Sequence, residues 1–368
     1  MKTLCINEPF VLESGEVLSQ LNISYQTFGQ LNADGTNVVW VFHALTGNSD
    51  PTEWWSGIVG RNQVIDPEKD FIVCANALGS CYGSSGPASV NPLTDEKYGA
   101  DFPFISIRDM VQAYQLLQQY LGIKEIQLGI GGSMGGQQLI EWSVSDPSLF
   151  KNNCLLATNA QFSAWGIAFN ESQRMAIHAD LSSNPTGENA GKQGLKAARA
   201  IAMLSYRTYQ TYSDSQQEQS NNVVANFKAS SYQQYQGEKF WNRFDVYSYL
   251  CLTKAMDSHN IGRKRAGIQQ ALTSIKAKTL IIGIQSDVLF PVKEQELLFK
   301  HIPNAQLEII DSPYGHDGFL VEVETISKLI QQFRNNTSTP FAAKKTGHCF
   351  YRRPQVHAPV ALPGSESF

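Results

Sequence analysis

Short and nearly continuous apolar runs recur along the chain and predict the strands of a parallel sheet. They are rich in β-branched and aromatic residues, which is typical of strands that are covered on both faces. The six runs lie at residues 37–45, 70–78, 126–132, 153–160, 278–287 and 305–312. Stretches in which apolar residues recur at helical spacing lie between several of these runs. The pattern therefore predicts an α/β fold, with a mostly parallel central sheet flanked by helices.

Two of the intervening helices can be placed from their apolar spacing and their ends. In residues 108–123 the apolar positions recur at helical intervals, and Gly122 supplies a stop. A second helix is expected to begin just after Ser133 and to end before Pro147, because the residue before a proline avoids helical geometry.

The alternation of strands and helices lapses from about residue 161 to residue 276. The stretch lacks strand-like runs and is rich in Ala, Gln, Tyr and Arg, so we expect a helical lid at 161–275 over the carboxyl ends of the strands. Its polar segment 212–222 predicts a mobile loop. The core would then comprise residues 1–160 and 276–335. Residues 336–368 lack periodicity and predict a disordered tail or an artefact of cloning.

Composition narrows the class of protein without changing this picture. Hydrophobic residues make up 42% of the chain and charged residues 17%, as in ordinary globular enzymes. A net charge of −4 argues against a nucleic-acid partner, and no apolar run is long enough to cross a membrane. The start of the chain lacks the apolar core of a secretory signal, and the six cysteines are scattered. These features predict a cytoplasmic location.

A cluster of glycines around one serine is the first sign of chemistry. The stretch GIGGSMGGQQLIEW contains Gly-x-Ser-x-Gly, with Ser133 between Gly131 and Gly135. In a nucleophile elbow such a serine occupies a sharp turn between a strand and a helix, which projects its hydroxyl above the sheet. Small residues in loops match this pattern by chance, so the motif needs support from the rest of the chain.

The order of the acidic and basic candidates supplies that support. α/β-Hydrolases place Ser, then Asp or Glu, then His at the carboxyl ends of strands. Asp287 ends an apolar run, and His316 lies in a glycine-flanked loop after the next run. Alone, Asp287 would be interpreted as a helix cap and His316 as a structural histidine. Their joint placement with Ser133 favours a catalytic triad, which needs no metal.

Acyl transfer through a serine also needs backbone donors for the oxyanion. One is expected to be the amide of Met134, which follows the nucleophile. The second is expected in the loop VFHALTGN after an early strand, and the Leu45 amide is the candidate. We interpret His43 in the same loop as a structural brace.

The motifs together resemble the homoserine O-acetyltransferase family, from about residue 10 to residue 333. The resemblance rests on YQTFGQLN, FHALTGN, YGADFPFISIRDMV, GGSMGGQQLIEW, IAFNESQRMAI, YQGEKFWNRFD, AMDSHNIGR, SDVLFP and YGHDGFL. It implies an α/β-hydrolase fold and a homodimer formed through the lid. It also implies acetyl-CoA as co-substrate with no bound cofactor, and a ping-pong reaction in which Ser133 is acylated before the acceptor reacts.

An acceptor such as homoserine has to compete with water, so its carboxylate and ammonium need binding groups. Arg199 and Tyr206 lie two helical turns apart and face the same way, and both match the family's substrate-binding positions. Asp317 matches the acid expected near the ammonium. The structural alternatives are an exposed lid arginine, lid packing and a helix N-cap, respectively.

Three functions stay open from the sequence. The first is acetyl transfer to the γ-hydroxyl of L-homoserine for methionine biosynthesis. The second is a related transfer that uses succinyl-CoA or accepts serine. The third is an esterase or thioesterase, in which water is the acceptor; the presence of Arg199, Tyr206 and Asp317 argues against it.

Overall fold

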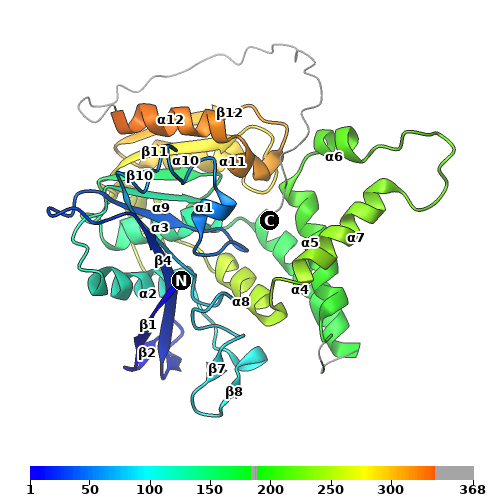
Figure 1. The fold of residues 1–368 in the computed structure, drawn as a ribbon, viewed down its shortest axis with the longest axis horizontal. Coiled ribbons are helices and arrows are strands. Elements are labelled where there is room, and N and C mark those ends of the chain that lie inside the picture. Colours follow the sequence, from blue (N-terminus) through cyan, green and yellow to red (C-terminus); the bar gives the residue numbers. More distant parts are fainter. Residues whose placement is uncertain (184–186, 188, 336–368) are drawn as a thin grey trace.

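An eight-stranded sheet forms the centre of the computed structural model, which describes residues 1–183, 187 and 189–335 (Figure 1). The tail predicted at 336–368 lies outside the described residues. Across the sheet the strand order is β1 (Lys2–Ile6), β4 (Leu21–Phe28), β6 (Phe71–Ala75), β5 (Val38–Phe42), β9 (Leu128–Gly132), β10 (Asn152–Leu156), β11 (Lys278–Ile284) and β12 (Ala305–Ile310).

The six predicted runs correspond, in chain order, to the six parallel strands β5, β6, β9, β10, β11 and β12. The two antiparallel strands at one edge, β1 and β4, were not predicted. The first is short and mostly exposed, so its sequence carries no buried pattern. Two small two-stranded pairs lie outside the main sheet: β2 (Phe10–Val11) with β3 (Val17–Leu18), and β7 (Val90–Asn91) with β8 (Glu96–Lys97).

Both faces of the parallel strands are buried, which explains the nearly continuous apolar runs. In β5, Trp40 and Phe42 pack on one face, and Val39 and Val41 pack on the other. The first face is covered by α2 (Ile107–Tyr120), α3 (Met134–Ser145), α9 (Ile268–Thr273) and α10 (Val292–His301). The second is covered by α1 (Pro51–Trp54), α11 (Gly318–Val321) and α12 (Val323–Asn335).

Between β10 and β11 the described chain is helical, and we call residues 161–275 the helical insertion. Its helices before α9 are α4 (Ala164–Ser183), α5 (Lys192–Tyr206), α6 (Tyr209–Gln216), α7 (Lys228–Trp241) and α8 (Val246–Asp257). Figure 1 shows α4 to α7 extending to one side of the sheet, with α8 nearer to it. The prediction of a loop over all of 212–222 is wrong, because Thr208 and Thr211 form a capping box that starts α6.

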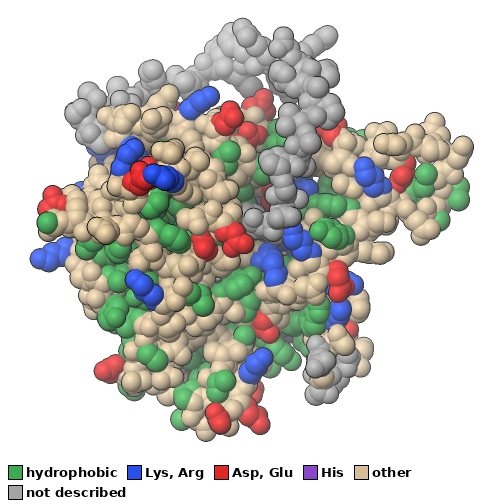
Figure 2. Space-filling model, in the orientation of Figure 1, with side chains coloured by type: hydrophobic (Ala, Val, Ile, Leu, Met, Phe, Trp, Pro, Cys, Tyr) green, Lys and Arg blue, Asp and Glu red, His purple; other side chains and the backbone are tan. Residues whose placement is uncertain are grey.

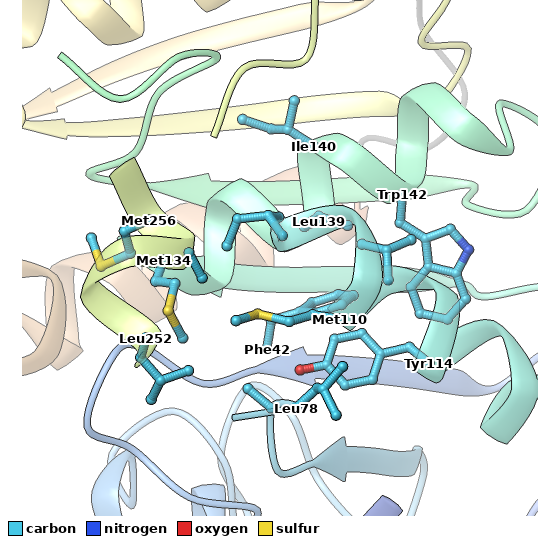
Figure 3. Packing of buried hydrophobic residues seen from close by; sticks show 14 of the residues in the cluster. Phe42, Leu78, Met110, Tyr114, Met134, Leu139, Ile140, Trp142, Leu252 and Met256 are labelled. Atoms are coloured by element: carbon cyan, nitrogen blue, oxygen red, sulfur yellow. The ribbon is translucent and has the colours of Figure 1, made fainter. Parts of the chain in front are cut away.

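The insertion packs onto the core at the start of α3. Figure 3 shows Met134 beside Leu252 and Met256 of α8, and the three belong to one buried apolar cluster. The same view shows Phe42, Tyr114 and Trp142, whose rings pack edge to face or stack beneath α3. The helix that follows Ser133 is therefore held from both the core and the insertion.

Charge is mixed on one face of the molecule. On the face drawn in Figure 2, acidic and basic side chains are interspersed rather than gathered by sign. Within the described ranges, none of the helices combines the length and the apolarity that crossing a membrane requires.

Candidate active site

Ser133 occupies the sharp turn between β9 and α3 that its motif predicts. Its φ of 55° and ψ of −126° are rare for a residue with a side chain, and such strain clusters at functional sites. The flanking glycines are required by close backbone approach. A Cβ on Gly135 would lie 2.3 Å from the Phe42 carbonyl oxygen, and one on Gly131 would lie 2.6 Å from the Gly135 carbonyl carbon.

The structure brings Ser133, Asp287 and His316 together, although they lie far apart in the sequence. His316 Nε2 is 2.9 Å from Ser133 Oγ, and His316 Nδ1 is 2.7 Å from Asp287 Oδ2. All three residues are buried. Because the ionised Asp287 only accepts hydrogen bonds, Nδ1 carries the proton and Nε2 is free to accept one from the serine.

Asp287 does not cap α10, which was the structural alternative for this residue. Its Oδ1 accepts hydrogen bonds from the amides of Leu289 and Phe290, at 2.8 and 2.9 Å, in the turn before the helix. These bonds fix the carboxylate while its other oxygen faces His316. The imidazole is also held between apolar rings, stacking on Phe290 with centroids 5.0 Å apart.

Of the two residues whose amides are expected to face an oxyanion, Leu45 lines the Ser133 pocket and Met134 begins α3. Leu45 is in a tight turn in which the Gly47 amide donates to the Ala44 carbonyl at 2.9 Å. Neither the Leu45 amide nor the Met134 amide donates a hydrogen bond to another of the described residues. Both are therefore available to a ligand beside Ser133 Oγ.

His43 braces this turn. Its Nδ1 lies 2.8 Å from the Ala44 carbonyl oxygen, and its Nε2 accepts a hydrogen bond from the Ala77 amide at 2.8 Å. Burial lowers the pKa of His43 to about 4, so the ring is neutral at physiological pH. A neutral ring can donate from one nitrogen and accept at the other, as both contacts require.

Arg199 and Tyr206 line the same pocket as Ser133, together with Asp317. Arg199 is 4% exposed, and its guanidinium lies over the rings of Tyr206 and Phe240, at 5.7 and 5.2 Å. It forms no salt bridge with the described residues, and its Nε has no partner among them. The alternative of an exposed lid arginine is therefore wrong.

Asp317 is paired in a way that the sequence did not suggest. Asp317 occupies the N-cap position of α11, as the structural alternative predicts, but its side chain makes no capping hydrogen bond there. One carboxylate oxygen accepts a hydrogen bond from Arg207 Nε at 3.1 Å. Burial raises the pKa of Asp317, and the cations of Arg207 and Arg199 oppose that rise. Arg207 was missed because it directly follows Tyr206 at the end of α5 and matches no motif.

Sequence reasoning also missed three further polar side chains near the site. Asn170 and Gln173, on α4, add polar groups to the pocket lining. Glu294, on α10, accepts a hydrogen bond from the Asn159 side chain at 2.7 Å, and burial raises its pKa to about 7. In the described part of the chain, no three His, Cys, Asp or Glu residues are grouped so that they could hold a metal ion.

Comparison with known proteins places the chain in a family. The family model of the alpha/beta hydrolase fold matches residues 37–323. A homoserine O-acetyltransferase of Cyclobacterium marinum is 48% identical over 326 residues, which span 89% of this chain and 93% of that protein. The chain belongs to the homoserine O-acetyltransferase family. The chain is thus an acyltransferase with the α/β-hydrolase fold.

Solved structures agree with this family assignment. The homoserine O-acetyltransferase from Staphylococcus aureus is 30% identical, with a TM-score of 0.77 over 93% of this chain and 97% of that one. Esterase E22 superposes with a TM-score of 0.82 over 90% of this chain and 99% of that one. At 23% identity the likeness to the esterase concerns the fold alone.

Proposed function

We propose that the protein transfers an acetyl group from acetyl-CoA to the γ-hydroxyl of L-homoserine, through an acyl-serine intermediate, in methionine biosynthesis. The observation that carries the proposal is the buried and unpaired guanidinium of Arg199 in the pocket that holds Ser133. A hydrolase that uses water needs no such group, whereas an amino-acid acceptor brings a carboxylate for it.

In the first half-reaction, His316 Nε2 takes the Ser133 proton as Oγ attacks the thioester carbonyl. The oxyanion that forms accepts hydrogen bonds from the amides of Leu45 and Met134. When the tetrahedral intermediate collapses, the C–S bond breaks, and coenzyme A leaves with the proton from His316. Asp287 holds the ring in the required tautomer and stabilises the imidazolium.

In the second half-reaction, homoserine is the nucleophile. Its carboxylate would bind Arg199 with Tyr206 alongside, and its ammonium would bind Asp317. Arg207 supports this role, since a neighbouring cation favours the ionised form of Asp317. His316 takes the γ-hydroxyl proton as that oxygen attacks the acyl group. The proton then passes to Ser133 Oγ, and O-acetylhomoserine is released.

The pocket lining favours acetyl over succinyl as the transferred group. Succinyl carries a second carboxylate, for which a second cation would be the strongest partner. Arg199 is the only Lys or Arg among the described residues that line the pocket, and we assign it to the acceptor. Serine as the acceptor and water as the acceptor are the alternatives that the experiment below separates.

We also propose the larger organisation of the enzyme. Residues 1–160 and 276–335 form the core, and residues 161–275 form a lid that carries Arg199 and Tyr206. Large apolar side chains on the lid are exposed, which supports a homodimer formed through the lid. We place the enzyme in the cytoplasm. Examples are Met175, Leu204, Tyr209, Val224 and Tyr235.

Release of coenzyme A, measured by thiol detection, tests the proposal. Acetyl-CoA and succinyl-CoA are each offered with homoserine, with serine and with no acceptor. We expect fast release only with acetyl-CoA and homoserine, and none from Ser133→Ala, which should also show no acyl-enzyme in intact mass spectra. Equal release without an acceptor would identify a thioesterase, and turnover by Ser133→Ala would exclude Ser133 as the nucleophile.

A further inference from the structure

Arg243 connects the helical insertion to the turn that carries Leu45. It lies between α7 and α8, and its guanidinium donates to both acceptors of Thr46. Nη1 is 2.9 Å from the Thr46 carbonyl oxygen, and Nη2 is 3.3 Å from the hydroxyl. Thr46 follows Leu45 directly and lines the Ser133 pocket.

The guanidinium of Arg243 is itself held in place. Nη1 also lies 2.9 Å from the Tyr82 hydroxyl, which in turn donates to the Arg243 carbonyl oxygen at 3.3 Å. Its plane lies over the Phe240 ring, 5.2 Å from the centroid. Arg199 lies over that same ring at 5.2 Å. One ring of the insertion thus supports both the pocket guanidinium and the guanidinium that holds the turn.

The Leu45 amide lies between two anchored residues. On one side, the Ala44 carbonyl oxygen is held by His43 and by the Gly47 amide. On the other side, both acceptors of Thr46 are held by Arg243. Without Arg243, neither acceptor of Thr46 would have a partner among the described residues, and that side of the turn would gain freedom. Donors to an oxyanion are effective because they are oriented before the charge develops.

We infer that Arg243 is a positioning residue that aims the Leu45 amide at the oxyanion, so that the helical insertion takes part in organising the oxyanion hole. The inference rests on the proposed function and extends it. Arg243 touches no reacting atom; it acts through Thr46. Its removal should slow both half-reactions, because each forms a tetrahedral oxyanion at the same place. Binding of homoserine should stay intact, because Arg199 is unchanged.

The test compares Arg243→Met, Arg243→Lys and a control, Arg263→Met. Arg263 also belongs to the insertion, but its guanidinium pairs with Glu13 and the Ser258 carbonyl rather than with the turn. We expect Arg243→Met to lower kcat by roughly 10- to 100-fold, short of the loss of a whole oxyanion donor, with the KM for homoserine within about twofold. Arg243→Lys keeps a donor for the Thr46 carbonyl and should recover part of the rate. Arg263→Met should keep kcat.

A short alkylboronic acid supplies a second readout, because it forms a tetrahedral adduct with an active-site serine. Its affinity should fall in Arg243→Met by about the same factor as kcat. Unchanged kcat and boronate affinity in folded Arg243→Met would overturn the inference. So would a rise in the KM for homoserine with boronate affinity intact. If the Met variant does not fold, the same two measurements on Arg243→Lys decide.

Failure of the proposed function would look different. It would appear in the unaltered enzyme, as absent acetyl transfer to homoserine. Boronate affinity requires only Ser133 and the oxyanion donors, so it reports on Arg243 whichever acceptor the enzyme uses.

Discussion

A buried guanidinium without a carboxylate partner is costly to hold, and Arg199 is such a group. Burial lowers the pKa of Arg199 from its usual value, and the aromatic rings around it offset only part of the lost hydration. A substrate carboxylate would restore the missing partner. The free-energy cost of burying this guanidinium is thus confined to the free enzyme and is offset when the acceptor binds.

Replacement of this one residue should separate the two half-reactions. In Arg199→Ala we expect the KM for homoserine to rise by roughly 30- to 150-fold, equivalent to about 2–3 kcal/mol of lost binding. Acylation of Ser133 by acetyl-CoA alone should change by less than about threefold. Arg199→Lys, which keeps the charge but loses the paired donors, should fall between. Both quantities can be followed by steady-state kinetics and by burst measurements.

The carboxylate-binding role would be wrong if Arg199→Ala lost donor acylation while its use of homoserine stayed normal.

At the scale of the element, the turn between β9 and α3 leaves almost no room for added side-chain atoms. Gly135 lets the first turn of α3 approach the end of β5 so closely that a methyl group would meet the Phe42 carbonyl. The same end of β5 leads into the turn that carries Leu45. Displacement of α3 would therefore move the Ser133 hydroxyl relative to its expected oxyanion donors.

Gly135→Ala should lower kcat by at least about 100-fold, because misplacement by about 1 Å has effects of that size. The free energy of unfolding should fall by about 1–3 kcal/mol from overpacking. Gly35→Ala is a control for strain without a clash, because Gly35, unlike Gly135, has a positive φ and faces open space. It should keep full kcat. Normal activity in Gly135→Ala would show that the helix can shift without moving Ser133.

Across the whole molecule, a group of ion pairs ties the N-terminal segment to the end of the insertion. Glu13 accepts hydrogen bonds from Arg108 on α2, at 3.0 Å, and from Arg263, at 2.7 Å. Arg265 pairs with Glu141 on α3, and Arg108 also lies 3.3 Å from that carboxylate. Burial alone would raise the pKa of Glu13, but the hydrogen bonds and charges of these arginines lower it to about 2.

The direction of this pKa shift determines how the free energy of unfolding depends on pH. Because the pKa of Glu13 is lower in the fold than its ordinary value of 4.5, its stabilisation is fully present above that pH and is lost as pH falls through about 2. Glu13→Gln should therefore lower the free energy of unfolding by about 2 kcal/mol at pH 7, with a smaller difference at pH 3. Denaturant melts at both pH values measure this. A constant difference would mean that the carboxylate charge is not what stabilises the fold.

A feature of this molecule can be predicted from the sequence where it depends on residues that are close together in the chain. The parallel strands are buried on both faces, so each shows as an apolar run, and Ser133 and Asp287 follow directly from the ends of such runs. By contrast, β1 is exposed and leaves no apolar run. The pairing of Asp317 with Arg207 spans 110 residues, and that of Thr46 with Arg243 spans 197. Such contacts are set by how the insertion packs, which no local pattern encodes.

The separation between the core and the helical insertion also has an evolutionary consequence. Under the proposed function, the groups that make and break the acyl bond lie in the core, as does Asp317, whereas Arg199 and Tyr206 lie in one helix of the insertion. Selection for an acceptor with a different group in place of the carboxylate can therefore act on that helix and leave the nucleophile untouched. The contact between Thr46 and Arg243 limits that freedom, since an exchanged insertion has to restore this contact for the core to keep its catalytic rate.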